Sequence, residues 1–193
     1  TLICIGPAPN IRQALEREPR ITQRARFVGM YGSVRRGYGA KSKPEAEWNV
    51  KANVEACRKA LGSAWDVTIT PLDTCGRVRL EGDKYAAVRD SEDPLVRALI
   101  ENYRIWCGKE PQRADKASST LFDTAAVYLA ISQRLMVMEK LGIRVTDDGM
   151  TVIDNRAKKI HCAVDWKDLP AFENFLVERL TGRVGDQDGF PQV

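Results

Sequence analysis

A run of apolar residues from Ala125 to Ile131 constrains the fold of this chain more than any other segment. At helical spacing it leaves almost no polar face, and a helix that is apolar all round is usually buried. The stretch that opens this helix, Ser118 to Ala126, nevertheless carries a carboxylate at Asp123, where an N-cap residue is expected. Asp123 therefore has two interpretations: it satisfies free helix N–H groups, or it points into a pocket and binds a cation or a hydroxyl.

The rest of the chain alternates between short apolar runs and helical periodicity. Strands are predicted at 1–5, 26–31 and 66–72, and helices at 10–17, 50–61, 82–88, 94–107 and 169–180, the first of them capped by Asn10. The turn Asp147-Asp148-Gly149 predicts a hairpin of 143–145 with 150–153, to which 160–166 adds a candidate third strand. This order predicts an α/β fold: a mostly parallel sheet with helices on both faces, plus a small antiparallel hairpin unit near the C-terminus.

Length and composition are those of an ordinary globular protein. The 193 residues predict one α/β domain over 1–193, and 44 % of them are hydrophobic and 29 % charged. The first residues resemble a strand with no start methionine, cap or turn before it, which predicts a domain truncated at its N-terminus. No apolar run reaches the roughly 18 residues that a membrane span needs, and no signal peptide is recognisable.

Charge and cysteine usage narrow the class of partners. The net charge is only +4 and the basic residues are scattered among acids, which argues against a nucleic-acid partner. The densest basic cluster, Arg35, Arg36, Lys41 and Lys43, lies in a Gly-rich loop and favours a solvated loop over a phosphate site. Five cysteines without a Cys-x-x-Cys pair argue against disulfides or a zinc site and favour a reducing, cytoplasmic compartment.

Polar side chains follow the predicted strands at their C-terminal ends, where ligands bind in open α/β sheets. Ile5-Gly6-Pro7 follows the first strand, and Glu47-Trp48-Asn49 closes the long loop after the second. A glutamate and an asparagine joined by an aromatic residue offer acceptors, a donor and a stacking face, which suit a sugar. The only histidine, His161, lies in an alternating run, where a structural or surface role is favoured over catalysis.

Taken in this order, these motifs resemble the inosine–uridine preferring nucleoside hydrolase family. The resemblance extends from residue 2 to residue 180 and implies a nucleoside hydrolase-like fold and a calcium-dependent N-glycosidase. It further implies a homo-oligomer that acts on a small-molecule nucleoside, with no nucleic acid and no membrane partner. The motifs that carry the resemblance are Gly6-Pro7-x-x-Asn10, Ala46-Glu47-Trp48-Asn49, Asp123-Thr124-Ala125-Ala126-Val127 and Gly149-Met150-Thr151-Val152-Ile153-Asp154.

The resemblance also implies roles for individual residues. Asp123 and the backbone carbonyl of Ile5 would bind Ca²⁺, a cation that accepts carboxylate and carbonyl oxygens. Glu47 and Asn49 would hold ribose hydroxyls. Trp48 would pack on the sugar, and Met30 would lie beside the ribose.

The chain departs from the family pattern in three places. The family's N-terminal aspartate cluster, which supplies the catalytic base and most calcium ligands, is absent from residues 1–193. Phe122 stands at the position of the family's histidine, which protonates the leaving base, and phenylalanine cannot act as an acid. Lys41 or Lys43 falls where the family places an asparagine. No residue of this chain is therefore assigned as catalytic.

Three functional hypotheses follow from these observations. The first is a ribonucleoside N-glycosidase, or the C-terminal part of one. The second is a degenerate hydrolase fold that binds ribosides without turnover. In the third, a plain structural module, Asp123 and Asn10 are helix caps and Glu47 is solvated.

Overall fold

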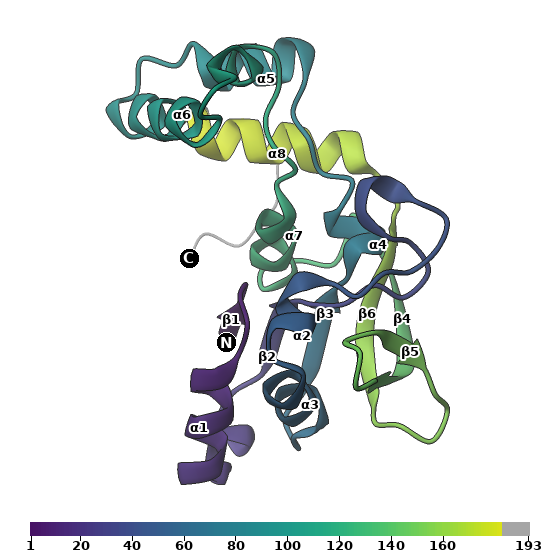
Figure 1. The fold of residues 1–193 in the computed structure, drawn as a ribbon. Coiled ribbons are helices and arrows are strands. Elements are labelled where there is room, and N and C mark those ends of the chain that lie inside the picture. The colour runs from purple at the N-terminus through teal and green to yellow at the C-terminus, as the bar shows by residue number, and fades with distance from the viewer. Residues whose placement is uncertain (183–193) are drawn as a thin grey trace. The chain divides into compact units, whose positions relative to one another are not determined.

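The computed structural model describes residues 1–182. The described chain divides into two compact units, which we name the sheet unit (1–78 with 120–167) and the helical unit (79–119 with 168–182). All six strands belong to the sheet unit, and each unit is continuous in space although it is built from two segments (Figure 1).

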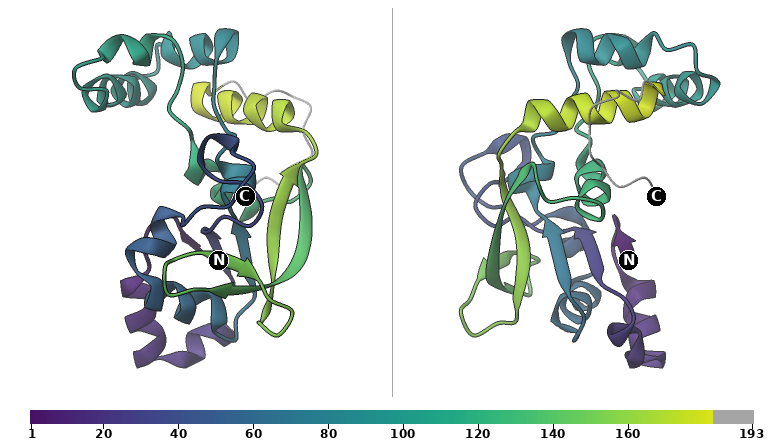
Figure 2. Two further views of the ribbon diagram at one scale, coloured as in Figure 1. Left: turned by 45° about the vertical axis from the view of Figure 1, so that its right-hand side comes forward. Right: turned by 180° about the vertical axis from the view of Figure 1, so that it is seen from behind.

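The sheet unit contains a six-stranded sheet in the order β1-β2-β3-β6-β4-β5 (Figure 2). Neighbours among β1, β2, β3 and β6 pair in parallel, whereas β4 pairs antiparallel with both β6 and β5. The predicted α/β fold with a mostly parallel sheet is confirmed. The strands are β1 (Leu2–Cys4), β2 (Phe27–Met30), β3 (Val67–Thr70), β4 (Met136–Val145), β5 (Thr151–Ile153) and β6 (Lys159–Trp166).

The central strands are buried along their whole length, as parallel strands covered on both faces should be. Every residue of β2 and β3 is buried. The ring of Phe27 lies 5.2 Å from that of Trp65 and 5.8 Å from that of Tyr31, measured between centroids. These aromatic contacts form the centre of the hydrophobic core and fix the start of β2 against its neighbours.

The predictions for the first two helical segments of the sheet unit are wrong in detail. Asn10 is the second residue of α1 and not its cap, because the helix begins at Pro9, which is favoured at a first helical position, after Ala8. The helix predicted over 50–61 is two helices that meet at Asn53, whose side chain accepts a hydrogen bond from Ala56 N (3.0 Å) and caps the second. The helices are α1 (Pro9–Arg17), α2 (Trp48–Ala52), α3 (Val54–Gly62), α4 (Leu72–Cys75) and α7 (Phe122–Leu129), with 3-10 turns η1 (Pro19–Gln23) and η2 (Tyr38–Ala40).

The antiparallel part of the sheet is longer than the sequence predicts. The hairpin of β4 with β5 is confirmed, and Gly149 takes φ +84°, a left-handed conformation that glycine adopts without strain. However, β4 begins seven residues earlier than predicted, at Met136. The sequence pattern does not reveal this part of the strand, because a register irregularity between Val137 and Met138 interrupts the alternation of its side chains. The third strand, β6, lies between β3 and β4 and so belongs to the main sheet.

The helical unit is built from three helices that the sequence predicts and one 3-10 turn that it does not. The turn lies inside the segment 108–120, for which the sequence predicts a polar linker. The hydroxyl of Tyr85 donates to Ala114 O and joins α5 to this turn. Within residues 1–182, no helix combines the length and the apolarity needed to cross a bilayer. The elements are α5 (Gly82–Arg89), α6 (Pro94–Trp106), η3 (Pro111–Asp115) and α8 (Leu169–Thr181).

Candidate functional site

Glu47 is the residue that organises the end of β2. Its carboxylate is 2 % exposed and accepts three backbone hydrogen bonds: Asn49 N at 2.8 Å, Val50 N at 3.3 Å and Gly32 N at 3.1 Å. The first two cap α2, and the third ties that helix to the residues after β2. Glu47 is therefore buried and hydrogen-bonded, and the hypothesis of a solvated Glu47 is wrong.

Asn49 is the second residue of α2 and is bonded to the last residue of β2. Its Nδ2 donates to Met30 O (3.0 Å) and contacts Met30 Sδ (3.3 Å). Both residues are buried, with Asn49 at 7 % exposure. Among residues 1–182, Asn49 Oδ1 has no hydrogen-bond partner, so the amide oxygen is the atom left to accept a bond from a ligand.

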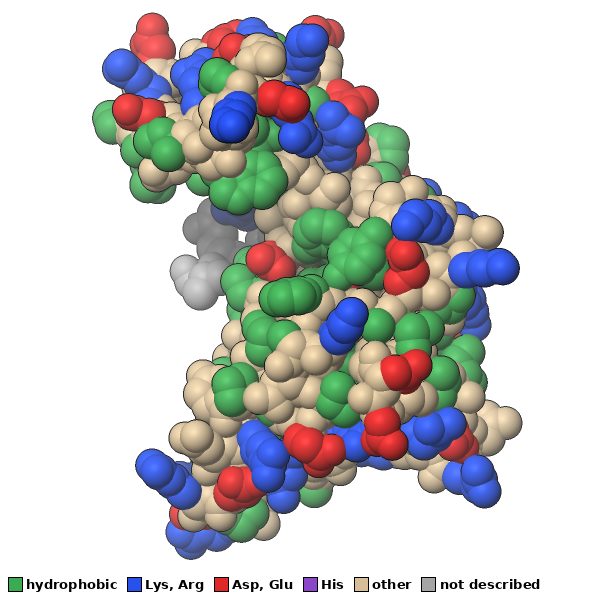
Figure 3. Space-filling view, in the orientation of Figure 1, with side chains coloured by type: hydrophobic (Ala, Val, Ile, Leu, Met, Phe, Trp, Pro, Cys, Tyr) green, Lys and Arg blue, Asp and Glu red, His purple; other side chains and the backbone are tan. Residues whose placement is uncertain are grey.

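Aromatic side chains cover the same end of the sheet. Trp48 is 66 % exposed, and its backbone N–H donates to the hydroxyl of Tyr38 (2.8 Å). The ring of Tyr38 meets that of Phe122 edge to face, with centroids 6.1 Å apart. Figure 3 shows hydrophobic side chains gathered on the visible face of the sheet unit, over α2 and the start of α7. Sequence reasoning missed Tyr38, although it is the single aromatic residue in the loop 32–46.

Asp123 lies in the first turn of α7 and is not the N-cap residue. Leu121 occupies that position, and Thr124 Oγ1 donates to Leu121 O (2.6 Å). The helix begins earlier than predicted because Phe122, which packs on Tyr38, already belongs to its first turn. The carboxylate of Asp123 is exposed and forms no hydrogen bond or ion pair within the described part of the chain. Its partial loss of solvation raises its pKa.

The prediction that the helix of Asp123 is apolar and buried on all sides holds for only part of its surface. Ala125, Ala126 and Tyr128 are buried, but Val127 is exposed. α7 packs against β1, β2 and β3. One side of the helix thus covers the parallel strands while the other faces solvent.

The structure brings Glu47 and Asp123 close enough for their charges to interact. Burial raises the pKa of Glu47, the backbone hydrogen bonds from Asn49, Gly32 and Val50 oppose that rise, and the charge of Asp123 adds to it. The two candidate carboxylates therefore share one end of the sheet with Asn49, and no cation pairs with either of them among residues 1–182.

Ile5 follows β1 and its side chain is exposed. The role of its backbone carbonyl as a metal ligand stays a prediction. The neighbouring turn is fixed by Tyr31, whose hydroxyl donates to Gly6 O and lies 2.9 Å from Cys4 Sγ. This hydroxyl holds the chain as it leaves β1. Because β1 and β2 are parallel, Ile5 and the residues that follow Met30 lie at the same edge of the sheet.

The first residues of the long loop are fixed by side chains from distant segments. Gly32 N donates to Glu47, and Ser33 N donates to Thr151 Oγ1 (2.8 Å), whose hydroxyl donates in turn to Ser33 O (2.8 Å). Gly32 takes φ +84°, and a Cβ there would lie 2.7 Å from Thr151 Oγ1. Only glycine fits this position, so Gly32 and Thr151 together set the path of the chain beside Glu47.

Asp73 continues this series of bonds. It is fully buried, and its two carboxylate oxygens accept Val34 N (2.9 Å) and Arg35 N (2.8 Å). Four successive N–H groups, from Gly32 to Arg35, are therefore held by side chains outside the loop. Sequence reasoning missed Asp73 because α4, the short helix that carries it, gives no periodic signal.

The described residues do not by themselves make a calcium site. Ca²⁺ takes six to eight oxygen ligands. Within residues 1–182, no group of three or more His, Cys, Asp or Glu side chains is placed to hold a metal ion. Of the carboxylates at this edge, Asp123 is free, whereas Glu47 already accepts three backbone hydrogen bonds.

His161 lies on β6, level with Thr68 of β3, and its Nε2 is 3.9 Å from Asp66 Oδ1. At the start of α7, Phe122 supplies a ring and no transferable proton. All five cysteines are unpaired thiols, as their spacing predicts.

Comparison with known proteins shows a family to which the sequence is similar. The family model described as inosine-uridine preferring nucleoside hydrolase matches residues 1–174. The chain is 26 % identical to the inosine-uridine preferring nucleoside hydrolase of Crithidia fasciculata and 29 % identical to that of Leishmania major, in each case over 96 % of this chain and 61 % of the relative. It thus spans about three fifths of the length of these relatives.

Solved structures agree on the fold. The purine-preferring ribonucleoside hydrolase from Gardnerella vaginalis superposes with a TM-score of 0.75 at 23 % identity, over 94 % of this chain and 60 % of that one. The nucleoside hydrolase from Bacillus anthracis gives a TM-score of 0.70 at 20 % identity, over 95 % and 60 %.

Proposed function

Because the chain belongs to the inosine-uridine preferring nucleoside hydrolase family, we propose that the edge of its sheet beside Glu47 binds a ribonucleoside whose N-glycosidic bond the complete enzyme hydrolyses. Water adds to the anomeric carbon and the base departs, which yields free ribose and a free base. The observation that carries the proposal is the meeting of Glu47, Asn49 and Asp123 at one edge, with neither carboxylate paired to a cation within residues 1–182.

Asn49 is the residue whose role is most sharply defined. Since Nδ2 is occupied by Met30 O, the free Oδ1 accepts a bond from a ribose hydroxyl. The lone pair that remains on Glu47 Oε1, which accepts only Asn49 N, is placed to accept from a second hydroxyl. Met30 contributes by holding Asn49 and so acts as a positioning residue.

The aromatic side chains supply the apolar surface that a nucleoside also needs. Trp48 presents an exposed ring for the sugar, and Phe122 with Tyr38 offers flat surface for the base. Phe122 offers no proton to the departing base, so base departure from this site depends on the leaving group itself or on another acid.

Calcium belongs to the proposal only in part. Asp123 and the Ile5 carbonyl would contribute two oxygens, and the described residues offer too few others for the coordination that Ca²⁺ requires. A homo-oligomer and a cytoplasmic location likewise stay predictions.

An asparagine pair tests the proposal. In the active enzyme, Asn49→Ala should lower kcat/KM for inosine and uridine. The loss should correspond to about 2–4 kcal/mol of transition-state stabilisation, because one well-placed polar partner contributes that much. Asn102→Ala, the same change at an exposed position of α6, should leave kcat/KM unchanged. Ribose release gives the rate, and calorimetry with inosine gives the affinity.

Equal catalytic efficiency in the two variants would contradict the role of Asn49. If the complete protein binds inosine but releases no ribose, the proposed hydrolysis is wrong and the protein binds ribosides without turnover. Loss of both binding and folding in Asn49→Ala, seen by circular dichroism, would reduce Asn49 to a structural residue, and Trp48→Ala would then test the site.

A further inference from the structure

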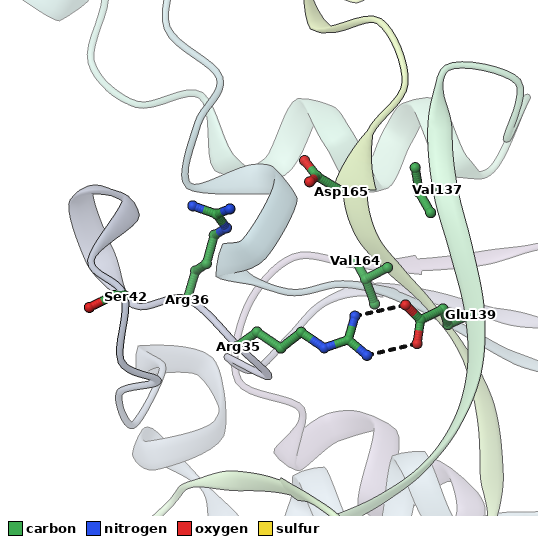
Figure 4. Close-up of a pocket in the computed structure, with 7 residues that line it drawn as sticks. All are labelled: Arg35, Arg36, Ser42, Val137, Glu139, Val164 and Asp165. Atoms are coloured by element: carbon green, nitrogen blue, oxygen red, sulfur yellow. Dashed lines mark hydrogen bonds and ion pairs between the residues drawn. The ribbon is translucent and has the colours of Figure 1, made fainter.

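A cavity of about 460 Å³ lies on the antiparallel side of the sheet unit and shares no residue with those proposed to bind the nucleoside (Figure 4). Two valines, Val137 and Val164, give it an apolar wall. Its other residues are charged or polar and come from the long loop and from β4 and β6. They are Arg35, Arg36, Ser42, Glu139 and Asp165.

Both carboxylates of this cavity are already engaged. Glu139 accepts two parallel bonds from Arg35, at 2.7 and 2.8 Å. Asp165 Oδ1 accepts bonds from Arg77 and from Trp166 N, the latter at 2.8 Å. Arg36 interacts with Asp165 only through its charge. Among residues 1–182, its guanidinium has no hydrogen-bond or ion-pair partner, and Figure 4 shows it beside the cavity.

The backbone that carries Arg36 is held in place. Ser33 Oγ donates to Arg36 O (2.6 Å) and accepts Glu45 N (2.9 Å), which joins the two limbs of the loop. On the other side, Asp73 holds Arg35 N. Arg36 therefore projects from a fixed peptide, and a ligand that binds it need not order the loop.

We propose that this cavity binds the phosphate group of a small anionic ligand through Arg36. The guanidinium fork matches an oxyanion in geometry and in charge, and its five N–H donors are unused within the described chain. Val137 and Val164 contact the apolar part of the ligand. This site is independent of nucleoside hydrolysis, since it uses none of the residues proposed for that reaction.

The test is a titration of the full chain with inorganic phosphate at constant ionic strength, followed by amide shifts in ¹H–¹⁵N spectra. We expect saturable shifts at Arg36, Ser42 and Val164. Arg36→Ala should weaken the affinity at least tenfold, and Arg36→Lys should fall between, because it keeps the charge and loses the fork. Lys43→Ala, which removes an exposed charge from the same loop but outside the cavity, should leave the affinity unchanged.

Equal affinities of the wild type and Arg36→Ala would overturn the proposal. Equal losses in Arg36→Ala and Lys43→Ala would also overturn it, because they would indicate attraction to the loop's overall charge. Shifts that grow linearly up to the solubility limit of phosphate would have the same meaning. Unchanged spectra of the variants away from the cavity verify that each one is folded.

Discussion

The two halves of the sheet treat their carboxylates in opposite ways. Beside the parallel strands β1–β3, burial of Glu47 and partial desolvation of Asp123 raise the pKa of each, with no cation in contact among residues 1–182. On the antiparallel side, hydrogen bonds from Arg35 lower the pKa of Glu139, and bonds from Arg156 and Arg144 lower that of Asp154.

This difference distinguishes carboxylates that lack a cation from carboxylates that arginine already pairs. Carboxylates paired with arginine are already satisfied and add little to stability when they are exposed. Carboxylates with raised pKa values and no cation are typical of functional sites, because the missing partner is a ligand. The contrast supports the proposal that a nucleoside binds beside β1–β3, and three predictions test it.

The largest expected effect concerns the missing proton donor. The single histidine lies on β6 beside Asp66, whereas Phe122 stands beside Asp123. General acid catalysis contributes about 10²–10⁴-fold, or roughly 3–5 kcal/mol. The active enzyme should therefore prefer p-nitrophenyl riboside, whose leaving group departs unaided, over inosine by a factor of this order in kcat/KM.

Steady-state kinetics on both substrates decides the matter, and Phe122→His should raise the rate with inosine more than the rate with p-nitrophenyl riboside. Equal efficiency on the two substrates would mean that another residue protonates the base. Tyr128, which lies on the same helix as Asp123, would then be the first residue to replace by phenylalanine.

The second prediction compares the same substitution in the two halves. Glu47→Ala removes the cap of α2 and leaves three backbone donors without their acceptor, which should cost about 3 kcal/mol of the free energy of unfolding. Glu139→Ala breaks a partly exposed ion pair and should cost about 0.2–1 kcal/mol. Urea unfolding measures both costs. Equal costs would show that Glu47 contributes no more to the free energy of unfolding than a surface residue does.

The smallest effect is a difference of sign in the pH dependence of stability. The folded pKa of Glu47 is raised above 4.5, so its contribution to stability is lost as pH rises through that folded value. The folded pKa of Glu139 is lowered below 4.5, so its contribution is lost as pH falls through that folded value.

Consequently, Glu47→Gln should make the slope of stability against pH more positive above pH 4.5. Glu139→Gln should make the slope less positive below pH 4.5. Urea unfolding at a series of pH values gives both slopes. Slopes that change in the same direction in the two variants would remove the electrostatic distinction between the halves.

The sequence predicts the sheet unit well where its signals are local. The apolar run around Phe27 and the Asp148-Gly149 turn each depend on a few neighbouring residues, and both elements are found as predicted. The early start of β4 is missed because its alternation is broken at Val137. The cap assigned to Asn10 fails because proline takes the first helical position.

The candidate site could be predicted only in part. Glu47 and Asn49 are adjacent in the sequence, so a motif can find them, and the structure adds that their hydrogen bonds are largely used within the fold. Tyr38, Asp73 and Thr151 act through partners 10 to 118 residues away, and no local pattern predicts such pairings.

Strand β1 borders the sheet and has one backbone edge that pairs with no other strand of residues 1–182. Its segment Leu2-Ile3-Cys4-Ile5 carries no charge and no proline, and Ile3 and Ile5 are exposed. Such an edge is a template for strands of other molecules. Purified alone, this chain should therefore self-associate as its concentration rises. Ile3→Lys should keep it monodisperse in light scattering, because the exposed side chain lies outside the core.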